Sequence, residues 1–244
     1  MEEIKYGPFV LTPNDTEDGY VISECAGALG SAVIPAEVGG YPITAIGEEA
    51  FINHAELREI HFLPRGGQSI EICDHAFDGC VSLRELDLPR EVFAVGYGAF
   101  RACTSLTKAT LGFDSFVGGY AFSGCTSLAE VTPLSYISEG VFENCTSLVT
   151  APISDKVTSI AEGAFEGCTS LTEVRIPAAV TEIEGMAFRS CTALKSVVFE
   201  ETAGWKQSCC YGDDITINVS DPRRNAARLS AMDFDDGITL WFRE

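Results

Sequence analysis

One phenylalanine recurs seven times along this chain at nearly constant spacing, and other residues recur in step with it. The intervals run from 20 to 26 residues, and the series is Phe51, Phe77, Phe100, Phe122, Phe142, Phe165 and Phe188. An aliphatic residue stands five positions before each Phe and a Leu six positions after it. A Cys stands three positions after each Phe, except in the first unit, where His54 takes its place. Self-similarity at this period is typical of a solenoid, because a single unit is too small to bury its own Phe and Leu and must stack on its neighbours.

The recurring positions also predict the local structure of a unit. The Leu opens an L-x-x-L-x-L spacing, as in Leu83-Leu86-Leu88, that predicts a short strand with alternate side chains turned inward. Pro often follows, as at Pro89, and ends the strand because it has no N–H to donate. The segment around each Ala-Phe is too short for a long helix, so we expect one helical turn there. Gly or Asn precedes the Cys position in five of the seven units, which predicts a left-handed residue that closes the turn.

The unit resembles that of the BspA-like leucine-rich-repeat family, whose hallmark is Ile-Gly-x-x-Ala-Phe-x-x-Cys-x-x-Leu. It reads Ile46-Gly47-Glu48-Glu49-Ala50-Phe51 in the first unit and Ala164-Phe165-Glu166-Gly167-Cys168-Thr169-Ser170-Leu171 in the sixth, and the match covers about residues 20–200. The fourth unit is short, and Gly is replaced after the aliphatic position by Cys73, Ser138, Ala161 or Glu184. The resemblance implies a curved α/β solenoid. It also implies a bacterial cell-surface protein that adheres to host, matrix or other cell-surface proteins.

The repeat breaks down at both ends, where a solenoid needs atypical units that shield its core from water. We expect an N-terminal cap with an incomplete repeat over residues 1–40, about seven repeat units over 41–200, and a C-terminal cap over 201–244.

The C-terminal cap is expected to run strand, helix, strand. Alternating apolar residues predict a strand at 215–219. Asp221-Pro222 supplies an N-cap followed by Pro at the first helical position, which predicts a helix over about 222–231. Asp235-Asp236-Gly237 predicts a turn into a closing strand at 238–242.

The cysteines and histidines carry no recognisable catalytic or metal-binding pattern. Zinc sites need closely spaced pairs of ligands, whereas six cysteines spaced one per unit indicate a buried ladder that needs neither metal nor disulfide. For Cys209-Cys210, off the ladder, burial and a cross-linking role both stay open. We expect His54 to be a hydrogen-bonded substitute for Cys and His75 to form a solvated pair with Asp74. Motifs such as H-E-x-x-H, G-x-S-x-G and Gly-rich phosphate loops are missing, so we expect no enzyme and no cofactor.

Charge and hydropathy restrict the partners. The formal net charge is −20, which repels the phosphates of nucleic acids and of anionic membranes. No apolar stretch approaches the ~18 residues of a membrane-spanning helix. The first residues do not read as a signal peptide, so we expect either a cytoplasmic chain or one whose leader has been removed.

The remaining candidate for function is the surface of the predicted strands. Residues that flank the central apolar position of each strand should point outward onto a concave sheet. The candidate partner-binding residues are Glu59, His61, Glu85, Asp87, Lys108, Thr110, Glu130, Thr132, Thr150, Glu173 and Arg175. This acidic and polar surface favours a protein partner with a basic or polar extended surface. A passive spacer within a larger surface assembly is the alternative, and an enzyme is a distant third.

Overall fold

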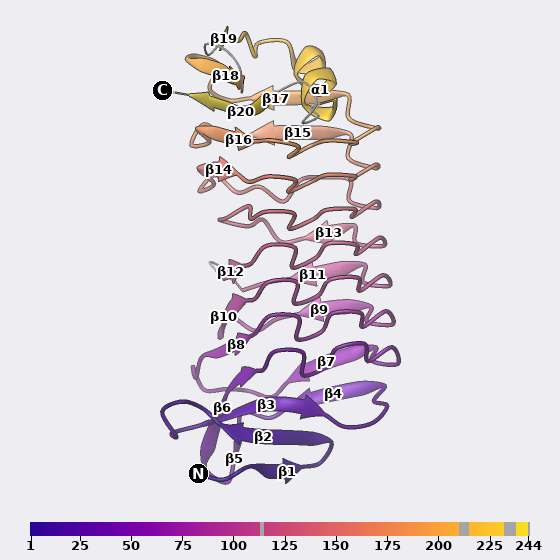
Figure 1. Ribbon diagram of the computed structural model, residues 1–244, viewed down its shortest axis with the longest axis vertical. Coiled ribbons are helices and arrows are strands. Elements are labelled where there is room, and N and C mark those ends of the chain that lie inside the picture. The colour runs from indigo at the N-terminus through magenta and orange to yellow at the C-terminus, as the bar shows by residue number, and fades with distance from the viewer. Residues whose placement is uncertain (113–114, 210–214, 232–237, 244) are drawn as a thin grey trace.

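The computed structural model describes residues 1–112, 115–209, 215–231 and 238–243 and shows a column of stacked coils (Figure 1). All seven phenylalanines are fully buried in one hydrophobic core that runs through the stack. The predicted solenoid is therefore confirmed. The description α/β is loose, however, because the described residues contain a single helix, α1 (Pro222–Ser230), and the coils themselves are built from strands and turns.

One row of parallel strands corresponds to the predicted L-x-x-L-x-L segments, and we call it the β4–β17 row. It comprises β4 (Ser31–Ile34), β7 (Glu59–Phe62), β9 (Glu85–Asp87), β11 (Lys108–Thr110), β13 (Glu130–Val131), β15 (Glu173–Ile176) and β17 (Ser196–Phe199). Hydrogen bonding joins β4 to β7, β9 to β11 and β13, and β15 to β17, and an isolated bridge between Thr150 and Glu173 extends the last group by one coil. In each strand the central apolar residue faces the core, as Leu86 does in β9.

A second row of parallel strands, the β6–β16 row, was not predicted. It comprises β6 (Tyr41–Ile46), β8 (Ile70–Ile72), β10 (Val92–Val95), β12 (Phe116–Val117), β14 (Ser159–Ile160) and β16 (Glu182–Glu184). Each strand ends at or next to the aliphatic residue that stands five positions before Phe. These strands are mostly two to four residues long, so alternation of apolar and polar residues has no room to appear in the sequence.

The segment around each Phe forms a series of tight turns, and the predicted helical turn is wrong. Residues two positions before and two positions after every Phe have φ between 53° and 73°, a left-handed conformation that a right-handed helix cannot contain. The left-handed residue predicted from Gly or Asn in five units is thus confirmed, and Ala102 and Ser190 adopt the same conformation in the other two.

This alternation of backbone conformation sends successive N–H groups in different directions. In the third unit, for example, the Ala99 N–H donates within the coil to Gly96 O at 3.3 Å, whereas the Phe100 N–H donates to Ala121 O of the next coil at 2.8 Å. The turn segments therefore satisfy their buried backbone groups by binding coil to coil, as the strands do.

Side chains in the core also form ladders. Neighbouring phenylalanine rings stack with centroids 4.7–5.8 Å apart. Each of the six ladder cysteines is a free, buried thiol whose Sγ–H donates to the carbonyl of the Phe in the preceding coil at 3.1–3.3 Å. The interpretation of these cysteines as a buried structural ladder is confirmed.

The N-terminal end is closed by β1 (Ile4–Tyr6), β2 (Phe9–Pro13) and β3 (Tyr20–Cys25), which pair antiparallel with one another. They continue the β6–β16 row because β3 pairs with β6 in parallel, while the short strand β5 (Glu37–Val38) pairs antiparallel with β6.

At the C-terminal end, β16 is followed in the sheet by β20 (Ile238–Arg243), β18 (Trp205–Cys209) and β19 (Ile215–Thr216), so the strand predicted at 215–219 has only two strand residues. Helix α1 begins after Asp221, whose carboxylate accepts the N–H groups of Arg223 and Arg224. The turn predicted at 235–237 and Cys210 lie outside the described residues, as does the side chain of Cys209.

Candidate protein-binding surface

The register of the β4–β17 row brings the predicted outward residues side by side. In one column Glu85 pairs with Lys108 and Lys108 with Glu130, and further along Thr150 pairs with Glu173. In the neighbouring column Asp87 lies beside Thr110, His61 beside Val33, and Arg175 beside Val198. Residues far apart in the sequence thus lie side by side within each hydrogen-bonded group of the row.

Most of these side chains are exposed. Thr110 and Thr132 are half-buried, and the other candidates are open to solvent. Thr132 also has a structural task, because its Oγ1 accepts the N–H of Leu111 at 3.0 Å. The available surface is therefore formed mainly by carboxylates together with Lys108, His61 and Arg175.

Some of the charges on this surface are already paired within the chain. Lys108 Nζ lies 3.7 Å from a carboxylate oxygen of Glu130, and His61 lies 3.1 Å from Glu59. Arg175 donates to Asp155 at 2.8 Å and to Glu200 at 2.7 Å. These pairs are exposed, so each contributes little to stability.

Three acidic residues of the surface keep their charge uncompensated. Glu85, Asp87 and Glu173 have no cationic partner within 4 Å among the described residues. Glu85 and Asp87 line a hollow of about 490 Å³ where β7 and β9 adjoin, together with Glu59, Arg58 and Arg84. Carboxylates therefore outnumber guanidinium groups around this hollow.

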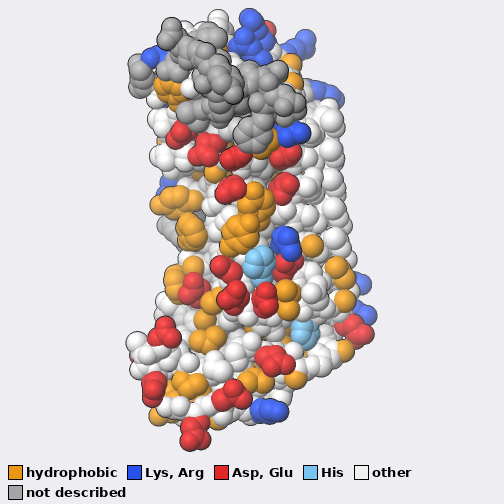
Figure 2. Space-filling view, in the orientation of Figure 1, with side chains coloured by type: hydrophobic (Ala, Val, Ile, Leu, Met, Phe, Trp, Pro, Cys, Tyr) orange, Lys and Arg blue, Asp and Glu red, His pale blue; other side chains and the backbone are white. Residues whose placement is uncertain are grey.

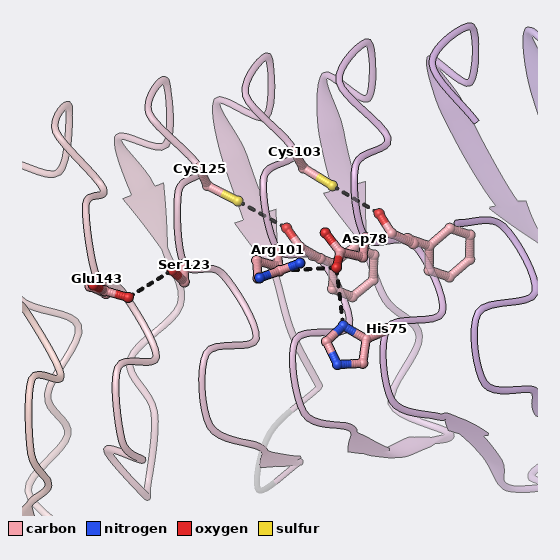
Figure 3. A network of polar contacts seen from close by, with 9 residues as sticks. His75, Asp78, Arg101, Cys103, Ser123, Cys125 and Glu143 are labelled. Atoms are coloured by element: carbon pink, nitrogen blue, oxygen red, sulfur yellow. Dashed lines mark hydrogen bonds and ion pairs between the residues drawn. The ribbon is translucent and has the colours of Figure 1, made fainter. Parts of the chain in front are cut away.

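A cross-coil polar network that was not predicted from the sequence lies on the turn segments. Asp78 is buried, and its Oδ2 lies 3.0 Å from His75 Nδ1 and 2.9 Å from Arg101 Nε, which comes from the next coil (Figure 3). The predicted pairing of His75 with Asp74 is wrong, because Asp74 instead accepts the Tyr97 N–H at 2.7 Å. The position after each Phe is the signal that could have found the network, since these residues face one another along the stack.

Aromatic rings also line up on the turn segments. The His75 ring lies 5.5 Å from that of Tyr97, which lies 5.4 Å from that of Tyr120, and the Tyr120 hydroxyl donates to Glu139 at 2.8 Å. Figure 2 shows one face of the stack, on which hydrophobic side chains and a histidine lie at mid-height with carboxylates above and below them. On the β6–β16 row, Phe93 and Phe116 are exposed as well.

The prediction that His54 is a hydrogen-bonded substitute for Cys is wrong. Its half-buried ring lies edge-on to Phe51 at 5.7 Å, and the described residues offer its side chain no hydrogen bond. An aromatic contact therefore replaces the thiol–carbonyl bond that the other six units make.

The ladder thiols have raised pKa values. Burial raises the pKa of the Cys80 and Cys191 thiols to about 12, and burial likewise raises the pKa of Cys103, Cys145 and Cys168. Such thiols are poor nucleophiles at neutral pH, because the thiolate is the reactive form. Within the described part of the chain, no three His, Cys, Asp or Glu side chains are grouped so that they could hold a metal ion. The described part of the chain contains no helix that is long and apolar enough to cross a membrane.

Solved structures with a similar fold are bacterial repeat proteins. A T. pallidum leucine-rich-repeat protein is 24% identical with a TM-score of 0.54, and the match covers 79% of this chain and 90% of that one. A leucine-rich cell surface protein from Faecalibacterium prausnitzii is 25% identical with a TM-score of 0.57, and the match covers 88% of this chain but 61% of that one. No curated protein is similar enough to this chain to count as a match.

The family assignment rests on the repeat itself. The model of the family described as "BspA type Leucine rich repeat region" matches this chain in six copies, over residues 29–133 and 115–217. These ranges together include all the ladder phenylalanines. The chain belongs to the BspA-type leucine-rich-repeat family.

Proposed function

We propose that this chain is a non-catalytic protein-binding module of a bacterial cell surface, and that it engages host, matrix or other cell-surface proteins through the exposed face of the β4–β17 row. The observation that carries the proposal is the register of that row, which lines up charged and polar side chains from separate coils on its exposed face. Among the described residues, Glu85, Asp87 and Glu173 on that face have no cationic partner within 4 Å. The cell-surface location is supported by the name of the similar F. prausnitzii protein.

The chemistry of this surface favours a basic partner. Its carboxylates attract Lys and Arg side chains and increase the rate of encounter, whereas like-charged proteins are repelled. Its outward columns carry no aromatic residues, so the surface lacks the large anchors that dominate tight interfaces. We therefore expect binding that is moderate in affinity and strongly dependent on salt.

The test is a triple charge reversal, Glu85→Lys, Glu130→Lys and Glu173→Lys, in one variant. Surface proteins of host epithelial cells are captured on the immobilised wild-type chain, and the affinity of each captured protein is then measured for the variant. Because six units of charge change on the contact surface, we expect affinity to fall by at least about tenfold.

A matched control reverses three exposed carboxylates elsewhere, Glu24→Lys, Glu48→Lys and Glu56→Lys, which gives the same net charge. The control should bind like the wild type. If the two triple variants bind equally well, the face of the β4–β17 row is not the site. If no surface protein is captured at all, the passive spacer becomes the better description of the chain.

A further inference from the structure

The two ends of the β4–β17 row are finished differently. At the C-terminal end, α1 packs on β17, and Asn225 Nδ2 donates to the outward carbonyl of Val197 at 3.0 Å. At the N-terminal end, where residues 1–112 are all described, β4 pairs only with β7. One edge of the row is therefore covered and the other is open.

The open edge of β4 presents backbone groups that lack partners. The carbonyls of Gly30 and Ile34 face β7, because they accept the N–H groups of Arg58 at 2.9 Å and Leu63 at 3.0 Å. Backbone groups alternate in direction along a strand, so those of Ser31 and Val33 point the opposite way, and within residues 1–112 they have no hydrogen bond. Such an edge is a template for another strand.

An apolar hollow lies along the same edge. It has a volume of about 310 Å³, and its lining includes Tyr6, Pro8, Leu29, Val33 and Leu63. Three of these are large hydrophobic side chains left exposed, with 48% of Tyr6, 48% of Val33 and 46% of Leu63 open to solvent. Exposed apolar surface that gathers at one place marks a site of interaction.

We propose that the edge of β4 binds an extended segment of a partner protein with alternating apolar and basic residues, which adds to the row as a further strand. The apolar side chains of the segment fill the hollow, and its backbone pairs with Ser31 and Val33, so recognition combines main-chain hydrogen bonds with a side-chain pocket. This inference rests on the proposed function only in that the chain binds proteins, since it concerns the edge of β4 and not the charged side chains of the β4–β17 row.

Charge decides between a partner and a second copy of this chain. Residues 1–50 contain nine Asp and Glu residues and one Lys, a net charge of −8. Two copies joined edge to edge would bring these like charges together, whereas Lys and Arg in a partner segment are attracted to them.

The first experiment uses a synthetic heptapeptide of alternating Lys and Val that is acetylated at its N-terminus and carries a fluorescent dye on its C-terminal amide. Its binding to the full chain is measured by fluorescence anisotropy. Two versions are compared, one N-methylated at every Val and the other at every Lys, which blocks one edge of the peptide or the other. A paired strand uses the N–H groups of one edge only, so the two versions should differ in affinity by about tenfold. If both bind as tightly as the unmodified peptide, strand addition is wrong.

The second experiment changes the protein. Leu63→Lys places a charge in the hollow and should weaken peptide binding by about tenfold. Val149→Lys is the matched control, because Val149 is 49% exposed and lies in another coil, and its binding should be unchanged. Equal binding by both variants would contradict the proposal. A wild-type dimer that Leu63→Lys dissociates would also overturn it, in favour of a second copy.

The triple variant of β9, β13 and β15 separates this inference from the proposed function. Its reversed charges lie away from β4, so it should keep the preference for one N-methylated version. Loss of that preference in the triple variant, with normal binding by Leu63→Lys, would refute the β4 site and leave the proposed function standing.

Discussion

At the scale of single residues, the shape of each coil depends on two left-handed positions that flank the Phe. Gly and Asn fill many of them at little cost, but Ala102 and Ser190 hold the same conformation after their Phe, with φ of 56° and 60°. For an L-residue with a Cβ this conformation costs roughly 1–2 kcal/mol. The repeat therefore tolerates strain at several coils, because the bonds between coils impose the same backbone path on every unit.

Replacing Ala102 should relieve this strain. Ala102→Gly is expected to raise the free energy of unfolding by up to about 1 kcal/mol, because Gly adopts φ > 0 without strain. This gain in the folded state should exceed the stability lost because Gly gives the unfolded chain more conformational entropy. Chemical denaturation followed by circular dichroism measures the change. Ala99→Gly, in the same turn but with a buried side chain and ordinary φ, should destabilise instead. The idea fails if both variants lower the stability.

The buried thiols should make the protein sensitive to alkali. Burial raises the pKa of Cys80 and Cys191 from 9.0 to about 12. Between these values an unfolded thiol loses its proton and a folded one keeps it, so the unfolded state binds fewer protons and stability falls as pH rises. Each such thiol should remove roughly 1.4 kcal/mol per pH unit above about pH 9.

Urea midpoints measured from pH 7 to about pH 11 will show this dependence as a decline that begins near pH 9. A Cys145→Ala variant, which has one ionisable group fewer in the ladder, should be less stable at pH 7 but decline less steeply. A midpoint that stays constant up to pH 11 would contradict the argument.

At the scale of elements, the attachment of α1 to β17 closes the end of the core. Asn225 is completely buried, and its Nδ2 donates to Val197 O at 3.0 Å and to Val219 O at 2.8 Å. A single amide thus satisfies one carbonyl of the last strand of the row and one carbonyl of the segment that leads into the helix.

Removal of that amide should loosen the end of the stack. Asn225→Ala leaves two buried carbonyls without a donor, and we expect a loss of about 2 kcal/mol, because each unsatisfied group costs roughly 1–3 kcal/mol and Ala recovers part of this as a better helix former. Hydrogen exchange should accelerate first in β17 and only later in the central strands. Arg224→Ala, at an exposed position of the same helix, serves as the control. Uniform exchange along the whole stack in Asn225→Ala would argue against local opening.

At the scale of the whole molecule, the stack of coils could be predicted because four positions recur in step: the Phe, the aliphatic residue before it, and the Cys and Leu after it. Recurrence of buried residue types at one period is explained by stacked units that share a core. The outward residues of the β4–β17 row followed from the same spacing, since a strand turns alternate side chains to opposite faces. The β6–β16 row was missed because its strands are too short to show alternation. The Asp78 network was missed for a different reason. Asp78 and Arg101 both stand directly after their Phe, but this position varies in residue type from coil to coil and therefore shows no repeat.

The coil-to-coil hydrogen bonds of the turn segments have a consequence for how such proteins vary in length. Phe51, Phe77 and Phe100 each donate an N–H to the coil that follows, so each of these turn segments offers donors to the next coil and acceptors to the previous one. The turn segment of an extra coil inserted in register therefore meets complementary backbone donors and acceptors in both neighbouring coils, so no new kind of interface is needed. Duplication of a unit therefore changes how far the two ends stand apart while leaving the chemistry of every junction as it was.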